Sequence, residues 1–404
     1  MNRVSERIRE NPDEAFIALM QHYDIEPEIA RVLNAKLRRR AGAGYTVLPV
    51  EGLVSRTESL IRSQIGHNFK LSNARWLSGG ASKLQMAFDL EWEGPDGITP
   101  QMTPMVLRME PPASTVETSR RREFEVLKAV TGVVPTPNCY WVDAEAEHLP
   151  YPGLIYEWVP GVTKPSSRPT HRVSGVGINF GPELRPILGP QFIDHLAGIH
   201  TLSADRIASL KSFIPAQIGS RAHVFRQINW WRRVWEEDRL EPLPLVDVAA
   251  RWLTDNAPPV DHVSIVHGDY RAGNFLYDEA TQRITAVLDW ELAVIGDRHQ
   301  DLAWLLGEHF GHYAEDGKTF LACGLLPADE IIRRYETTSG LTVDLARMQY
   351  FRVFNDYVGV VHMLASAVRV ARHSKGHQDV VVAWVATIGN MIAGGLQASL
   401  EGLL

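Results

Sequence analysis

The chain of 404 residues is 45% hydrophobic and 22% charged, as in soluble globular proteins long enough to form more than one lobe. Its 41 basic and 48 acidic residues give a formal net charge of −7, which excludes a general attraction to nucleic acid or anionic membranes. The two cysteines form no Cys-x-x-Cys pair, the N-terminus is charged, and no apolar run approaches about 20 residues, so we expect a cytoplasmic protein without disulfides or a membrane span.

The first part of the chain, residues 1–68, is predicted to be a helical extension. The sequence Asn11-Pro12-Asp13-Glu14 is typical of a helix start, with acidic residues near the positive end of the helix dipole. Two more helices are predicted over 27–40 and 54–65. The first of these helices ends in the basic run Lys36–Arg40. Basic side chains at a helix C-terminus ordinarily interact with the helix dipole, so we favour this role over a contact with nucleic acid or lipid.

From residue 69 the pattern changes to β-strands. Residues 74–77 and 84–92 flank a glycine-bearing segment, Ser78-Gly79-Gly80-Ala81-Ser82-Lys83. Because glycine has no Cβ, such a hairpin tip lets backbone N–H groups approach a phosphate closely, although the spacing is neither G-x-x-x-x-G-K-[ST] nor G-x-G-x-x-G. The candidate nucleotide-covering residues are Ser78, Gly79, Gly80 and Ser82.

Several elements separate this hairpin from a helical half. A strand is predicted over Met105–Met109, a helix over 119–127, and two further strands over 139–142 and 154–159. The linker that follows, Thr163–Pro190, is rich in Gly, Pro and Ser. We therefore expect the strand-rich part to end before this linker.

The helical half contains two groups of residues with alternative interpretations. Residues 221–240 mix tryptophans with arginines, which could stack nucleic acid bases, but the acidic net charge favours inward packing or a small-molecule wall. Glu308, His309 and His312 suggest a metal site, which the lack of an H-E-x-x-H motif disfavours. Helices are predicted over 192–200, 221–240, 328–339, 345–372 and 378–400.

The stretch Val263–Glu291 carries the strongest chemical signal. Its short apolar strands place Asp269 and Asn274 in one loop and Asp289 at the end of a neighbouring strand. Two hard oxygen ligands suit Mg²⁺, and a third group, a carboxylate, could orient and deprotonate a hydroxyl. The H-x-D-x-x-x-x-N spacing is that of a kinase catalytic loop. A plain β-hairpin with surface carboxylates is the alternative, which the ordered pair of motifs disfavours.

These residues resemble a known family. H-G-D-Y-R-A-G-N-F-L followed by I-T-A-V-L-D-W-E is similar to the aminoglycoside phosphotransferase-like family, also called the phosphotransferase enzyme family, and especially to kinase-like domains related to those fused to acyl-CoA dehydrogenases. The resemblance begins at residue 69 and ends near residue 395. It implies an α+β, protein-kinase-like fold of two lobes around an ATP cleft: a small α+β lobe at 69–160 and a large, mainly helical lobe at 161–404.

The resemblance implies roles for five residues. Asp269 would orient the acceptor hydroxyl and accept its proton, and Asn274 and Asp289 would hold Mg²⁺. Arg108 stands where a kinase carries a lysine for the α- and β-phosphates, and related domains have the same V-L-R sequence. Glu123 matches the Arg-Glu-(Tyr/Phe) pattern of the family and is the expected partner of Arg108.

Four further assignments follow. Glu125 is the fallback partner of that arginine. Arg271, by its spacing from Asp269 alone, could stabilise charge on the γ-phosphate. The segment Tyr156–Gly161 resembles the hinge where an adenine ring would bind backbone groups, and Asp297 corresponds to an aspartate that helps hold the catalytic centre. The candidate hinge residues are Glu157 and Trp158.

Together these expectations describe an ATP- and Mg²⁺-dependent small-molecule kinase. Cationic aminoglycosides need an acidic cleft. The late helix instead carries more cations than acids: Arg347, Arg352, Arg369, Arg372 and Lys375 against Asp356 and Asp379. An apolar, aromatic or anionic metabolite or xenobiotic with a hydroxyl group is therefore the favoured acceptor. A nucleotide-binding pseudokinase and an antibiotic (aminoglycoside or macrolide) phosphotransferase remain alternatives, while D-W-E and the lack of an A-P-E segment disfavour a protein kinase.

Overall fold

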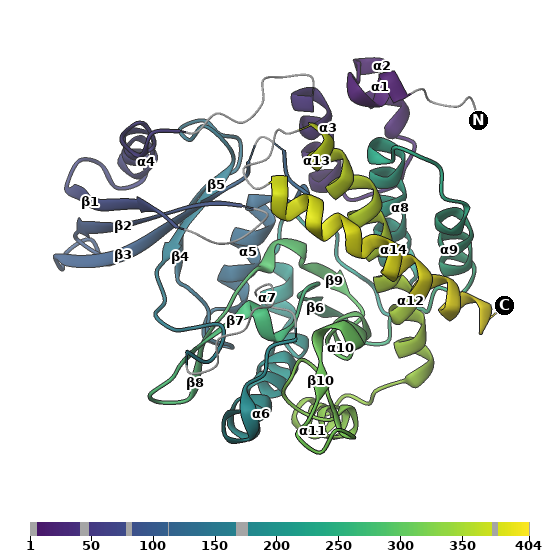
Figure 1. Cartoon of the computed structure of the whole chain (residues 1–404). Helices are drawn as coiled ribbons and strands as arrows, with labels where there is room; N and C mark the ends of the chain where they lie inside the picture. The colour runs from purple at the N-terminus through teal and green to yellow at the C-terminus, as the bar shows by residue number, and fades with distance from the viewer. Residues whose placement is uncertain are drawn as a thin grey trace.

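A computed structural model describes residues 6–40, 48–77, 83–111, 113–166, 177–373 and 379–403. Helices at the N-terminus precede a five-stranded antiparallel sheet, and a mainly helical region follows (Figure 1). The α+β class expected from the sequence is therefore confirmed. None of the described helices has the length and the apolar character that crossing a bilayer requires.

The N-terminal helices lie in two places. Helices α1 (Glu6–Glu10), α2 (Glu14–Met20) and α3 (Pro27–Arg40) lie against the helical region, whereas α4 (Val50–Ile65) lies on the sheet (Figure 1). The side chain of Asp13 accepts a hydrogen bond from the first turn of α2, as the cap sequence predicts.

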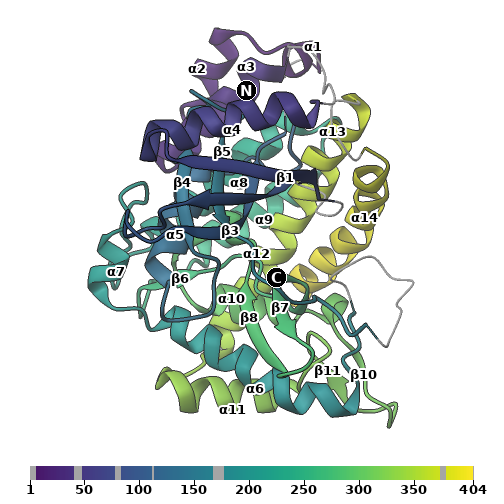
Figure 2. The ribbon, with the colours of Figure 1, turned by 90° about the vertical axis from the view of Figure 1, so that its left-hand side faces the viewer.

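The sheet has the strand order β1-β2-β3-β5-β4. Neighbouring residues of a strand face opposite sides, so Ile155 packs into the core below α4 while Leu154 packs into the core around α5. Helices α4 and α5 therefore cover opposite faces of the sheet (Figure 2). The elements are β1 (Phe69–Trp76), β2 (Leu84–Trp92), β3 (Gln101–Met109), α5 (Arg120–Val130), β4 (Cys139–Asp143) and β5 (Gly153–Glu157).

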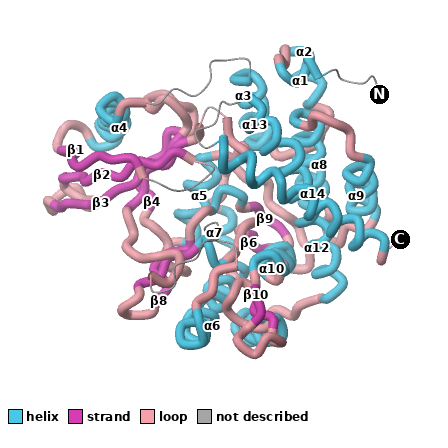
Figure 3. Tube along the Cα trace, in the orientation of Figure 1, coloured by secondary structure: helices cyan, strands magenta, loops and turns pink. Residues whose placement is uncertain are grey.

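The helical region surrounds short strands that carry the polar loops (Figure 3). One core packs α6, α11 and the hairpin β7–β8, and another packs α3, α8, α9, α12 and α14. The helices are α6 (Gly181–His200), α7 (Ala204–Ala208), α8 (Ala222–Asp238), α9 (Pro244–Asp255), α10 (His299–Leu305), α11 (Ala328–Ser339), α12 (Leu345–Val361), α13 (Val368–His373) and α14 (Asp379–Glu401). The short strands are β6 (Ser264–Val266), β7 (Phe275–Asp278), β8 (Arg283–Val287), β9 (Val294–Gly296), β10 (His312–Tyr313) and β11 (Phe320–Leu321).

Helix α6 begins earlier than the sequence indicates. The expected linker was to extend to Pro190, but the helix starts at Gly181 and contains Pro186 and Pro190 in its interior. Proline removes a backbone donor and normally ends a helix. Here Leu188 and Phe192 are buried in the core, and this burial offsets the lost hydrogen bonds.

The helix predicted over 345–372 is helical throughout its length but is not uniform. A π-helical segment, His362–Ala367, separates α12 from α13. Such segments are rare and occur mostly at functional or strained positions. This one allows the Ser366 hydroxyl to donate to Asp238 Oδ2 at 2.7 Å.

The basic run Lys36–Arg40 has a different role from the one expected. Lys36 Nζ lies 2.6 Å from Glu237 Oε2 and 3.1 Å from Asp238 Oδ1, and Arg40 also forms an ion pair with Asp238. These groups are buried, and a buried charge without a partner is costly. Lys36 and Arg40 therefore anchor α3 to the end of α8, whereas Arg38 and Arg39 form ion pairs with Glu14 and Glu117.

Candidate active site

The loop after β6 is supported by Asp301, which lies in α10. The Asp301 carboxylate accepts hydrogen bonds from the backbone N–H groups of His267 at 2.6 Å and Gly268 at 2.8 Å. Gly268 has a φ of +83°, and a Cβ there would lie 2.6 Å from Leu292 O. Only glycine therefore fits this position without displacing the neighbouring backbone.

His200 extends this support into the core. Its Nε2 lies 3.1 Å from Asp301 Oδ2, and its Nδ1 lies 2.9 Å from the Tyr335 hydroxyl. All three side chains are buried. The loop after β6 is thus connected through α10 and α6 to helix α11.

Asp297 does not hold the loop, contrary to the expectation. Its Oδ1 lies 2.6 Å from His299 Nδ1, and its Oδ2 accepts from Arg347 Nη1 at 2.6 Å. Burial alone would raise the pKa of Asp297, but these contacts lower it to about 2. Asp297 precedes α10, whereas Asp301 lies one turn later on the helix face toward the loop. Asp301 therefore binds the loop backbone, and Asp297 does not.

Asp269 lies at the centre of a group of side-chain donors. Its Oδ1 accepts from Arg271 Nε at 2.9 Å and from Trp304 Nε1 at 2.8 Å, and its Oδ2 accepts from Asn274 Nδ2 at 2.7 Å. The Asp269 side chain is 17% exposed. The carboxylate is therefore oriented by the protein and still open to a ligand.

Trp304 was not recognised from the sequence as part of the site. It follows Asp301 by three residues in α10, so both side chains lie on the same helix face. That spacing would have identified Trp304 once Asp301, rather than Asp297, had been placed under the loop.

Asn274 and Asp289 are brought together by the hairpin β7–β8. The N–H of Leu288 donates to Asn274 O at 2.8 Å, and Asp289 follows with a left-handed φ of +68°. The amide nitrogen of Asn274 donates to Asp269, which leaves its oxygen as the group that could bind a metal. An amide oxygen and a carboxylate suit Mg²⁺, so the residues present fit the expected ion.

Arg108 connects this loop with the sheet. Its Nε lies 3.4 Å from Glu123 Oε1, and its Nη2 forms an ion pair with Asp289. The structure thus brings together the arginine and the glutamate that the sequence paired. The fallback partner, Glu125, instead accepts hydrogen bonds from the backbone and hydroxyl of Ser212. A planar guanidinium reaches two carboxylates at once, which an ammonium group does less well.

Arg108 belongs to a buried ion network that the sequence did not reveal. Its most connected acid is Glu291, whose Oε2 lies 2.8 Å from Lys83 Nζ and 3.1 Å from Arg120 Nη2. Burial alone would raise the pKa of Glu291, but the surrounding cations hold it well below its usual range. The buried ion network consists of Lys83, Arg108, Arg120, Glu110, Glu123 and Glu291.

The hinge candidates are only partly available to a nucleotide. The N–H of Glu157 donates to Asn138 O at 2.9 Å, and that of Trp158 donates to Pro104 O at 2.8 Å. An adenine ring at this segment would therefore have to use other backbone groups. The Trp158 side chain is 38% exposed. The loop candidates Ser78, Gly79, Gly80 and Ser82 lie outside the described residues.

Aromatic side chains flank Asp269 on the side of α10. The ring centroids of Trp304 and Phe310 are 4.8 Å apart, and the Arg271 guanidinium carbon lies 5.7 Å from the centre of the Phe310 ring. His309, which is exposed, lies beside both rings.

The late-helix cations have mostly structural partners. Arg347 binds Asp297, and Arg369 Nε donates to Asp238 O at 2.7 Å. Arg372 Nη2 lies 3.2 Å from Glu10 Oε1. These three arginines therefore do not support an anionic acceptor site, in contrast to the expectation. The tryptophans of α8 are also structural, since they are buried in a core: Trp230, Trp231 and Trp235.

The structure does not gather the suggested metal group of Glu308, His309 and His312. Within the described ranges, the side chains that come within metal-ligating distance of one another are Asp261, Asp297 and His299. Arg298 and Arg347 form ion pairs with the acids of that group. These two cations already neutralise the carboxylates, which disfavours a metal ion there.

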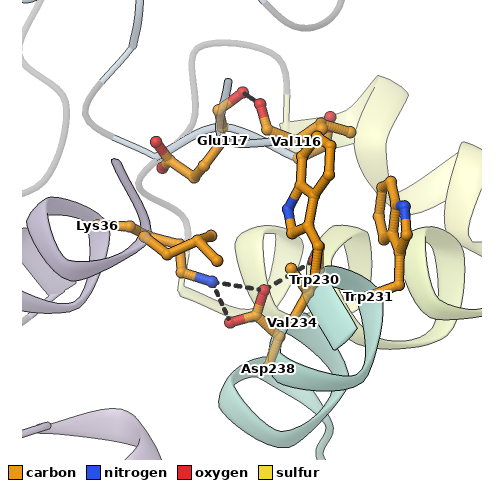
Figure 4. Close-up of a pocket in the computed structure, with 11 residues that line it drawn as sticks. Lys36, Val116, Glu117, Trp230, Trp231, Val234 and Asp238 are labelled. Carbon is orange, nitrogen blue, oxygen red and sulfur yellow. Dashed lines mark hydrogen bonds and ion pairs between the residues drawn. The ribbon is translucent and has the colours of Figure 1, made fainter. Parts of the chain in front are cut away.

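A small cavity lies between α3, α8 and the loop before α5 (Figure 4). It has about 250 Å³ of empty space, part of which is open to solvent. Figure 4 shows Lys36 directed at Asp238, with Trp230 and Trp231 opposite. None of its described lining residues is a candidate for phosphoryl transfer, so this cavity is distinct from the site around Asp269.

Three comparisons with known proteins concern the family and the fold of the chain. Residues 95–322, more than half of the chain, match the model of the phosphotransferase enzyme family. Acyl-CoA dehydrogenase family member 11 of Pongo abelii is 27% identical over 262 residues, which are 61% of this chain and 31% of that protein. Family member 10 of Mus musculus is 26% identical over 205 residues, 50% of this chain and 18% of that protein. The chain thus spans about a third or less of these relatives.

Two solved structures are similar to this chain to different degrees. A Ralstonia eutropha protein named as a candidate aminoglycoside phosphotransferase has a TM-score of 0.60 and 20% identity, over 86% of this chain and 98% of that chain. A thermostable mutant of aminoglycoside phosphotransferase APH(4)-Ia, in ternary complex with AMP-PNP and hygromycin B, has a TM-score of 0.47 and 17% identity, over 84% and 98%. The first similarity confirms the kinase-like fold expected from the sequence.

Proposed function

The chain belongs to the phosphotransferase enzyme family, and from that premise we propose that it is a small-molecule kinase. It uses ATP and Mg²⁺ and transfers the γ-phosphoryl group to a hydroxyl of an apolar, aromatic or anionic compound. The observation that carries the proposal is the convergence of Asp269, Asn274 and Asp289, with Arg108 reaching the last of them from the sheet.

The proposed reaction is a displacement at the γ-phosphorus. The acceptor oxygen forms a bond to this phosphorus while the bond to the bridging oxygen breaks, so that ADP leaves, and the hydroxyl proton passes to Asp269. Asn274 and Asp289 would hold the metal. When bound, Mg²⁺ supplies charge neutralisation at the phosphates.

Arg108 would exchange partners when the nucleotide binds. Its Nη2 now pairs with Asp289, whereas its Nε faces Glu123. Asp289 would turn to the metal, which frees this end of the guanidinium for a phosphate while Glu123 keeps the side chain in place. Arg271, which now binds Asp269, is the second cation near the transferred group.

The acceptor class rests on the surroundings of Asp269. The rings of Trp304 and Phe310 and the cation Arg271 lie beside the carboxylate, and flat or anionic hydroxyl compounds complement such groups. We expect aromatic alcohols and hydroxycarboxylates to stimulate ADP release from ATP. Stimulation by aminoglycosides alone, measured in the same panel, would instead indicate an antibiotic kinase.

Calorimetric titration of ATP, with and without Mg²⁺, tests the proposal. We expect micromolar binding that requires Mg²⁺ and that Asp289→Asn weakens, because this variant loses the ligand charge but keeps a residue that tolerates a left-handed backbone. Asp255→Asn, on the exposed side of α9, is the matched control. If ATP binds equally well without Mg²⁺ and in Asp289→Asn, the protein is a pseudokinase. If ATP does not bind at all, the assignment of a nucleotide site is wrong.

A further inference from the structure

We propose that Trp304 is a positioning residue for Asp269 and that it directs the acceptor hydroxyl to one oxygen of this carboxylate, Oδ2. The inference rests on the proposed function and deepens it, since it states where the acceptor must approach. The observation behind it is the hydrogen bond of 2.8 Å from Trp304 Nε1 to Asp269 Oδ1.

The donors around Asp269 leave one position for a substrate. A carboxylate has about four lone-pair sites, two on each oxygen. Among the residues that the structure describes, Trp304 and Arg271 donate to Oδ1, and only Asn274 donates to Oδ2. A hydroxyl that gives its proton to Asp269 therefore meets a vacant acceptor site on Oδ2. This is also the side of Asn274, so the hydroxyl would lie between the base and the proposed metal.

Trp304 is better suited to fix the carboxylate than the other donor on the same oxygen. Arg271 lies in the same loop as Asp269 and has a long side chain that is 20% exposed, so it can move with the loop or turn to a phosphate. Trp304 comes from α10 and has only two side-chain torsions, and its ring packs on Phe310.

Helix α10 thus controls the catalytic aspartate in two ways. Asp301 holds the backbone of the loop, and Trp304, three residues later, holds the carboxylate. Both contacts come from one rigid element, so the direction of the base relative to the hairpin that carries Asn274 is set by a single helix. Without the indole N–H, the carboxylate can rotate and expose Oδ1 to the hydroxyl, in an orientation away from the metal.

The variant Trp304→Phe removes the donor and keeps an aromatic ring against Phe310. We expect kcat of ATP hydrolysis, with water as acceptor, to fall about tenfold while KM for ATP stays within about twofold. Trp252→Phe, in α9 and stacked on Tyr350, is the control and should leave both constants unchanged. An unchanged kcat for Trp304→Phe, or equal changes in kcat and KM accompanied by a large loss of melting temperature, would overturn the proposal.

A second measurement does not depend on turnover. In a ¹H–¹⁵N spectrum, Trp304→Phe assigns the indole signal of Trp304 by its disappearance. We expect Asp269→Asn to shift this signal, whereas Asp255→Asn should not. If the indole signal does not shift in Asp269→Asn, the hydrogen bond is absent and the proposal fails, even if the enzyme is active. If the signal responds but the wild type neither binds nor hydrolyses ATP, the contact stands and the proposed kinase function fails.

Discussion

The two regions that would cooperate in phosphoryl transfer are held in place by different forces. The buried ion network between the sheet, α5 and the loop of Asp289 consists of charges that are almost completely removed from water. The group around Asp269 is partly exposed and is held by hydrogen bonds from α10 and from its own loop.

This difference predicts how each region responds to substitution. A buried charge that loses its partner destabilises the fold, because desolvation is no longer compensated. A partly exposed carboxylate that loses a donor can be rehydrated, so the fold remains and only the geometry of the reaction changes. Substitutions in the ion network should therefore mainly reduce stability, and substitutions around Asp269 should mainly reduce turnover.

Asp269→Asn should produce the largest effect and only on turnover. We expect ADP release to fall by about 10² to 10⁴, the usual contribution of a general base, because an amide cannot accept the hydroxyl proton. Binding of Mg²⁺ and ATP, followed by calorimetry, should change little, and so should the melting temperature. Turnover within tenfold of wild type would show that Asp269 is not the base.

Lys83→Met should produce the largest loss of stability. The Lys83 side chain is 1% exposed and lies between Glu110 and Glu291, so its removal leaves both acids with fewer partners. We expect the free energy of unfolding, from denaturant titration, to fall by about 3–5 kcal/mol.

The matched control for Lys83→Met is Arg251→Met. Arg251 and Asp255 form an ion pair in which the side chains are 83% and 59% exposed. Such a pair contributes less than about 1 kcal/mol. Equal losses in the free energy of unfolding in the two variants would mean that burial does not make the ion network more important for stability than a surface ion pair.

Arg108→Lys tests the point at which the two regions meet. A lysine keeps the charge but cannot hold Glu123 and Asp289 through separate nitrogens, as Arg108 does. We expect calorimetry to show affinity for ATP with Mg²⁺ that is about tenfold weaker, with a smaller change in stability than in Lys83→Met. Unchanged affinity would assign Arg108 to the structure alone.

Asp356→Asn should give the smallest effect, in the opposite direction. Among the described residues Asp356 forms no ion pair, and burial raises its pKa to about 6, against the effect of Arg352. A raised folded-state pKa means that the native form binds the proton more tightly, so stability is lost as pH rises from about 4 to 6. The asparagine variant should be more stable by about 1–2 kcal/mol at pH 7.5 and equal to wild type below about pH 4. Denaturant titrations at both pH values would show this, and a variant less stable at pH 7.5 would contradict it.

The sequence could predict what is encoded locally. Asp269 and Asn274 precede the hairpin β7–β8 and Asp289 follows it, so strand periodicity and a motif fix their relative positions. The pairing of Arg108 with Glu123 came from the resemblance and is present. The roles of these residues in phosphoryl transfer remain predictions.

The remainder of the site depends on contacts between distant parts of the chain. Lys83 and Glu291 are 208 positions apart in numbering and meet only because the lobes meet. The charge of Arg369 seemed available to a substrate until the end of α8 was found beside it. Asp297 and Asp301 could be distinguished only when the face of α10 toward the loop was known. Composition and periodicity carry no information about such partners.

The hydrogen bonds that link His200 to the loop after β6 define which ring nitrogen carries its proton. Asp301 accepts from two backbone amides, and as a carboxylate it can only accept, so the proton of His200 must lie on Nε2 and its Nδ1 must receive the hydrogen of Tyr335. Burial lowers the pKa of His200, so the ring stays neutral and this single tautomer persists across physiological pH. Tyr335 and His200 thus donate toward Asp301 from the core, and the N–H groups of His267 and Gly268 donate to it from the loop. The hydrogen bonds that support the loop after β6 therefore keep this arrangement as long as His200 stays neutral.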